Sequence, residues 1–116
     1  MSDKRRSMIY EPYFIQTEFE LIQSELILGS VIERLNLNKE WGKKYARDIL
    51  KTPETMILLT GRIDLRPVRN TSLIEIRVYS EKPDEAAKIA NAVAGAYRDY
   101  RLQERMRKIS GSIRVL

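Results

Sequence analysis

The feature that most constrains the fold is a change of hydrophobic period within residues 63–97. In residues 74–79, aliphatic residues alternate with charged residues and a tyrosine, as in a strand with one buried face. The shorter run 62–66 alternates in the same way. Between them, residues 69–72 (Arg-Asn-Thr-Ser) favour a turn, because short polar side chains bond to nearby backbone. The sequence therefore predicts an antiparallel hairpin over residues 62–80.

After Ser80 the period changes to that of an amphipathic helix. Pro83 suits the first helical position, and Asp84 and Glu85 place negative charge where the helix dipole favours it. One stripe of this helix is apolar and mostly small: Ala86, Ala90, Val93, Ala96, Tyr97 and Tyr100. The small side chains favour close packing of the helix on the sheet or on another helix.

A second apolar stripe follows on the same predicted helix, formed by Leu102, Met106, Ile109 and Ile113. At about 100° per residue it lies near the back of the first stripe. One helix cannot present both stripes to one small core, so this half must kink, pack on another subunit, or begin a longer helix. A frayed end with scattered apolar residues is the alternative. We treat the four residues as a candidate oligomer interface.

The part before the hairpin is predicted to be helical. Residues 12–23 and 25–35 present apolar faces on roughly opposite sides, which indicates two helices with Ser24 as the side-chain cap of the second, or one helix buried on both sides. We expect a further helix over 39–50, with Trp41, Tyr45 and Ile49 at four-residue spacing on its apolar face. Another helix is expected from Thr52, as the cap, toward Gly61. Residues 1–10 resemble a loose basic leader.

The composition argues against most catalytic chemistry. The 116 residues contain neither cysteine nor histidine, which removes disulfides, thiol catalysis, the usual general base and the commonest metal ligands. The five glycines are isolated from each other, so no phosphate-binding loop is present. Carboxylate pairs such as Glu18/Glu20 and Asp84/Glu85 do not converge on one helix face, and we interpret them as solvated. The sequence predicts a single non-enzymatic domain without a metal or cofactor.

The net charge of +5 is concentrated in the tails: residues 1–6 carry +2, residues 98–116 carry +4 and the remainder carries −1. A nucleic-acid-binding domain is expected to have its basic face on the folded body. A small basic nucleic-acid-binding module that uses the last helix is therefore the alternative function. No apolar run approaches the roughly 20 residues that span a bilayer, and no signal peptide is recognisable.

Four arginines of the hairpin region form a candidate cationic patch for a phosphate or an acidic sugar: Arg62, Arg66, Arg69 and Arg77. The competing interpretation pairs Arg77 with Asp64 or Glu75. Aromatic side chains would also suit stacking on sugars. Those at positions 45, 97 and 100 lie on apolar stripes, however, and we expect them in the core.

Two segments together resemble a known family. Residues 70–76 (Asn-Thr-Ser-Leu-Ile-Glu-Ile), with the Tyr-Ser-Glu-Lys-Pro-Asp-Glu-Ala-Ala-Lys-Ile-Ala-Asn run from Tyr79, are similar to the hallmark of polysaccharide chain-length determinants, the polysaccharide co-polymerases. Residues 14–24 and 31–37 resemble the first helical region of that family. The resemblance covers roughly residues 10–102.

The resemblance implies an α+β domain, here with hairpin 62–80 packed against several helices and a long C-terminal helix. It also implies a location facing the bacterial periplasm, with anchoring in the inner membrane by flanking helices. Such proteins form homo-oligomers and govern the length or export of a surface lipopolysaccharide or exopolysaccharide made by a separate polymerase. The implied partners are therefore further copies of the chain and the polymerase or its lipid-linked product. A related variant carries a cytoplasmic tyrosine kinase.

The sequence departs from the family pattern in several places. Both membrane segments are absent, and the strand usual before Tyr10 is missing or reduced. Lys82 stands where an Asp commonly precedes the proline. The family's long helix would continue beyond Leu116. The resemblance thus implies an excised domain, with residues 98–116 as the stump of a longer helix.

Overall fold

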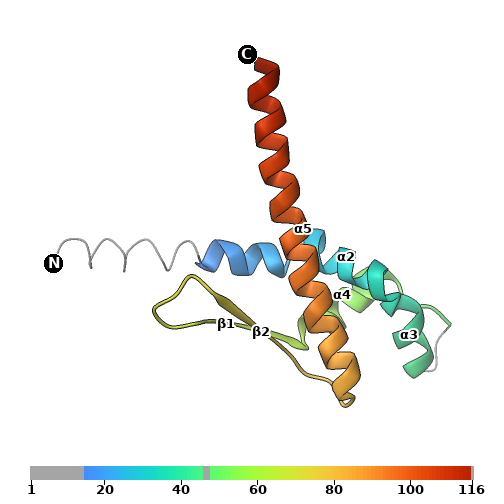
Figure 1. Ribbon diagram of the computed structural model, residues 1–116. Helices are drawn as coiled ribbons and strands as arrows, with labels where there is room; N and C mark the ends of the chain where they lie inside the picture. Colours follow the sequence, from blue (N-terminus) through green and yellow to red (C-terminus); the bar gives the residue numbers. More distant parts are fainter. Residues whose placement is uncertain (1–14, 46–47, 116) are drawn as a thin grey trace.

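The computed structural model describes residues 15–45 and 48–115, with side chains as far as Ile109 (Figure 1). Residues 15–22 are helical and precede the labelled elements. In chain order these are α2 (Glu25–Leu35), α3 (Leu37–Lys44), α4 (Thr52–Thr60), β1 (Ile63–Pro67), β2 (Ile74–Val78) and α5 (Pro83–Val115). The fold is α+β, as predicted.

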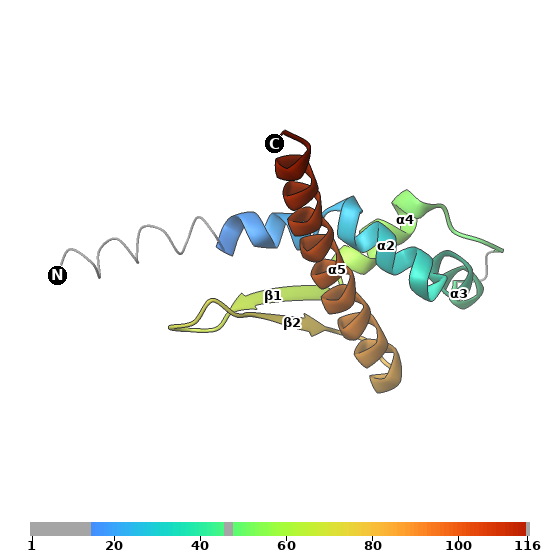
Figure 2. The ribbon, with the colours of Figure 1, turned by 45° about the horizontal axis from the view of Figure 1, so that its top comes forward.

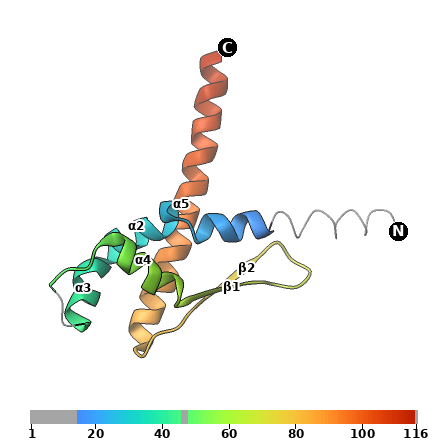
Figure 3. The same cartoon turned by 180° about the vertical axis from the view of Figure 1, so that it is seen from behind.

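Helix α5 organises the molecule. Its first half packs on α2 and on strand β2, with the hairpin on one side and α2–α4 on the other (Figures 1 and 3). Its second half projects beyond the body as a single continuous helix (Figures 1 and 2). The kink that we considered for this helix is therefore not present.

The core lies where α2, α3, α4 and the hairpin meet the first half of α5. Its largest fully buried side chain is Trp41. On α5 the buried positions are Ile89, Val93 and Ala96. Ile89 was not part of the predicted stripe, although it lies between two of its members on the helix surface. Tyr97 and Tyr100 pack against the core, as expected.

The hairpin agrees with its prediction. β1 and β2 are antiparallel, with Ile63 opposite Val78 and Pro67 opposite Ile74. Asn70 adopts the left-handed conformation, with φ of 64°, in the connecting turn, which asparagine tolerates better than most residues. Along β2 the aliphatic side chains are half-buried and the charged ones are exposed. The period-two pattern thus identified the buried face.

The helix break at Ser24 is confirmed, because one helix ends at residue 22 and α2 begins at Glu25. The predicted cap is wrong: the Ser24 hydroxyl donates back to the Leu21 carbonyl at 2.6 Å, and its side chain caps nothing in α2. The Ser24 hydroxyl instead provides a donor for a backbone carbonyl at the C-terminal end of the preceding helix. The predicted start of that helix at Pro12 and the leader 1–10 lie outside the described residues.

The predicted helix 39–50 is too long and starts too late. Asn36, with φ of 54°, ends α2, and α3 starts directly at Leu37 and ends at Lys44. The chain then folds back so closely that a Cβ on Gly42 would lie 2.9 Å from the Asp48 carbonyl oxygen. Gly42 therefore serves a close backbone approach, a tertiary contact that a helical period does not encode.

The start of α4 was also misassigned by one residue. The cap position is Lys51, and Thr52 is the first helical residue. The Lys51 N–H is satisfied by the Glu54 side chain at 3.1 Å. The Thr52 hydroxyl accepts a hydrogen bond from the Asn38 side chain at 3.2 Å, and Asn38 in turn accepts one from buried Thr55 at 2.5 Å. These bonds tie α4 to α3.

Candidate functional site

The part of α5 beyond Arg101, residues 102–115, is hereafter the arm. Three members of the predicted second stripe are exposed on it: Leu102 by 56%, Met106 by 57% and Ile109 by 49%. The fourth, Ile113, lies on helical backbone, and its side chain is outside the described part. The two stripes of α5 therefore have different environments, since one is buried in the body and the other faces solvent.

Two ion pairs fix the point where the arm leaves the body. Arg34 of α2 binds Asp99 at 2.8 Å on the surface. Two residues after Asp99, Arg101 binds the carboxylate of Glu18. The Arg101 guanidinium also lies 5.6 Å from the centroid of the Tyr97 ring. Hydrogen bonds to Tyr97 and Glu18 raise the pKa of Arg101. Two separate helices thus hold the base of the arm.

Glu18 is not the solvated residue that we expected. It is only 2% exposed, and its Oε2 atom has no hydrogen-bond partner within the described part of the chain. The sequence contained a signal, because Glu18 lies three residues after Ile15 and four before Ile22, on the apolar face. Its partner Arg101 is 83 positions away, so no local pattern pointed to the pair.

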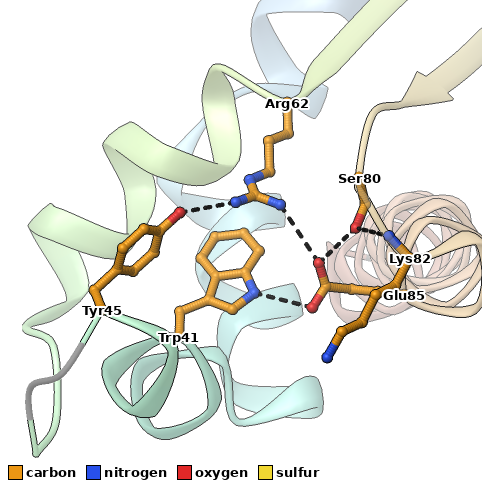
Figure 4. Close-up of polar contacts among 6 residues, drawn as sticks. All are labelled: Trp41, Tyr45, Arg62, Ser80, Lys82 and Glu85. Atoms are coloured by element: carbon orange, nitrogen blue, oxygen red, sulfur yellow. Dashed lines mark hydrogen bonds and ion pairs between the residues drawn. The ribbon is translucent and has the colours of Figure 1, made fainter.

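A polar cluster joins α3, the residue before β1 and the start of α5 (Figure 4). The Arg62 guanidinium lies 4.6 Å from the Trp41 ring centroid and 3.4 Å from a Glu85 oxygen. The Trp41 N–H donates to the other Glu85 oxygen at 3.3 Å. Glu85 is therefore engaged and only 23% exposed, which corrects the expectation of a solvated Asp84/Glu85 pair.

The rim of this polar cluster is formed by Ser80 and Tyr45. The Ser80 hydroxyl donates to Glu85 at 2.8 Å, and Arg62 donates to the Tyr45 hydroxyl at 2.9 Å. Tyr45 is 43% exposed and does not belong to the core, contrary to our expectation. Burial, the largest influence, raises the pKa of Glu85, but hydrogen bonds from Ser80 and Trp41 with the charges of Lys44 and Arg62 lower it overall.

The structure does not bring the four arginines of the candidate cationic patch together as free cations. Arg62 points into the polar cluster. Arg66 and Arg77 lie on the hairpin surface, each 2.8 Å from a carboxylate of its own strand, Asp64 and Glu75 respectively. The strand register also places Asp64 opposite Arg77 and Arg66 opposite Glu75. The hairpin surface is thus charge-compensated, with exposed Arg69 in the turn beyond it.

A hollow of about 1070 Å³ lies between the end of α2 and the start of α5. Its floor includes Leu37 and Ile89, and its rim carries charges of both signs, including Lys82, Asp84 and Lys88. Within the described residues, no group of three acidic, histidine or cysteine side chains is placed to hold a metal ion.

Comparisons with protein-family models, with curated proteins and with solved structures find no match for this chain. Among the helices within residues 15–45 and 48–115, none is both long and apolar enough to cross a bilayer.

Proposed function

We propose that this chain is a non-enzymatic domain of a bacterial inner-membrane protein that regulates the chain length or export of a surface polysaccharide. It acts through homo-oligomerisation and through contact with the polymerase or its lipid-linked product, on the periplasmic side of the membrane. The observation that carries the proposal is the arm: the helix α5, which begins within the family-like segment 70–97, extends past its own core with an exposed apolar stripe.

Two further observations support this proposal. The family-like segment folds as one unit, in which the hairpin leads directly into α5 and packs against it. Arg62 of the candidate cationic patch is used for structure, since Arg62 and Glu85 bind each other and Trp41. A non-enzymatic domain of this kind acts by holding its binding surfaces in fixed positions for further copies of the chain and for the polymerase.

The function is tested in the bacterium that carries the gene. Leu102, Met106 and Ile109 are replaced by serine in the full-length protein, and surface polysaccharide is extracted and separated by length. We expect a shifted or broadened length distribution, or lost export, because the exposed stripe no longer supports assembly. The matched control replaces Arg107 and Lys108, on other faces of the arm, by serine. An unchanged distribution in the stripe variant at normal protein levels contradicts the proposal.

The nucleic-acid alternative would use the basic residues of the last helix, Arg98, Arg101, Arg105, Arg107 and Lys108. Two of them are engaged in ion pairs, Arg101 with Glu18 and Arg107 with Glu104 at 3.2 Å. We expect no measurable binding of a DNA duplex at physiological salt. Binding of the duplex by the whole chain that falls steeply between two salt concentrations would favour the alternative, because phosphate contacts release counterions.

A further inference from the structure

The spacing on the arm is that of a coiled-coil seam. Leu102, Met106, Ile109 and Ile113 are separated by four, three and four residues, which is the alternation of d and a positions in a heptad. We propose that the arm pairs with the arm of a second copy of this chain as a parallel, in-register coiled coil. The orientation rests on the proposed function, because copies anchored in one membrane present their arms in the same direction.

The seam is already organised for pairing. It lies on helical backbone that continues a helix anchored in the body, so pairing does not have to nucleate a helix. The ion pairs Arg34–Asp99 and Glu18–Arg101 hold its base. The three described seam side chains are about half exposed, so their burial in a partner removes apolar surface from water without opening the core.

The flanking residues are compatible with a parallel partner. In the heptad, Arg98 and Arg105 occupy g positions and Gln103 an e position. Neither arginine has an ion-pair partner among the residues that the structure describes, and all three are exposed. In a parallel pair the g residue of one helix faces the following e residue of the other. Arg98 then meets Gln103 of the second copy, a donor opposite an amide acceptor.

The seam is short, so pairing through the arm alone is weak. Two heptads bury far less than the roughly 800 Å² per partner of a standard interface, and we expect a dissociation constant of roughly 10–1000 μM. In the membrane-anchored protein, flanking segments hold the copies together and raise the effective concentration. Weak pairing of the chain alone is therefore compatible with stable assembly of the full-length protein.

Cysteine cross-linking tests the pairing and its orientation, because the chain has no cysteine of its own. In a parallel in-register pair, Leu102→Cys lies opposite itself and forms a disulfide-linked dimer under mild oxidation. The control Lys108→Cys, on another face of the arm, does not. An antiparallel pair would instead link Leu102→Cys with Ile113→Cys in a mixture and leave Leu102→Cys unlinked with itself. That result overturns the proposal.

Sedimentation across concentrations supplies two further tests. Replacing the three described seam residues by serine weakens association at least tenfold. Gln103→Glu strengthens it roughly threefold at low salt, because each glutamate then faces Arg98 of the other copy. A chain that remains monomeric to about 1 mM, or that associates equally well with serine in the seam, refutes the proposal. If the seam pairs but serine there leaves polysaccharide length unchanged, the proposed function fails and the pairing stands.

Discussion

Replacing Glu85 by alanine tests whether the polar cluster holds α5 to the rest of the body. The substitution removes the acceptor of the Trp41 N–H, of the Ser80 hydroxyl and of the Arg62 guanidinium in one step. These donors belong to α3, to the segment before α5 and to the residue before β1. The change therefore disconnects the first turn of α5 from three other parts of the chain.

The expected loss can be estimated from the burial of each donor. Trp41 is 1% exposed, and leaving a buried N–H without an acceptor costs about 1–3 kcal/mol. The Arg62–Glu85 pair is partly exposed, at 18% and 23%, so screening limits its contribution to about 0.5 kcal/mol. We expect Glu85→Ala to lower the free energy of unfolding by about 2–3 kcal/mol and the melting temperature by roughly 10 °C.

The measurement is urea unfolding followed by fluorescence, because Trp41 is the only tryptophan and lies in the polar cluster itself. Asp84→Ala is the matched control, since it removes the same charge from the same helical turn at an exposed position. The control loses only the interaction with the helix dipole, about 0.5 kcal/mol. Equal destabilisation by both substitutions would refute the role of the polar cluster.

Three other predictions follow from the same contacts. Gly42→Ala should destabilise the protein by about 1–3 kcal/mol through a backbone clash. Gly29→Ala, where the added Cβ makes only an ordinary contact with the Glu25 side chain, should stabilise it by up to about 1 kcal/mol in the same urea assay. Arg101→Ala should cost about 3 kcal/mol, because it leaves the charge of Glu18 buried and unpaired; Glu18→Gln should cost clearly less, and equal losses would contradict this. The pKa of Glu85 is lowered in the folded state. The ionised carboxylate therefore adds to the free energy of unfolding above its unfolded pKa near 4.3, and this contribution is lost as the pH falls through the folded pKa. The difference in free energy of unfolding between the wild type and Glu85→Gln should narrow from pH 7 to pH 3.

Local signals were sufficient for the elements whose causes are local. The hairpin followed from period-two alternation and turn residues, and the start of α5 from Pro83 and the acidic residues after it. The break between the first helix and α2 followed from two apolar faces on opposite sides. In each case the determining residues are neighbours in the sequence, which is why pattern and structure agree.

The errors at α3, Glu18 and Arg62 have a different cause, which is contact with residues outside the element itself; the cap errors at Ser24 and Thr52 are local. The end of α3 depends on the approach of residue 48 to Gly42. The burial of Glu18 depends on Arg101, and the inward position of Arg62 depends on Trp41 and Glu85. A charged residue looks solvated in a linear pattern whenever its partner lies on another element. Arg62 is the member of the candidate cationic patch to which this applies, whereas Arg66 and Arg77 bind carboxylates of their own strands.

The division of α5 into a buried half and an arm has an energetic consequence. The polar cluster engages the first turn of α5, the two ion pairs engage its middle, and the seam lies beyond both. The three described seam side chains, Leu102, Met106 and Ile109, do not belong to the core, so changes there should alter association and leave unfolding unaffected. Sites without shared partners have additive effects on free energy. Combining Glu85→Ala with serine in the seam should therefore give the sum of the separate changes, and a larger loss would mean that pairing of the arm stabilises the body.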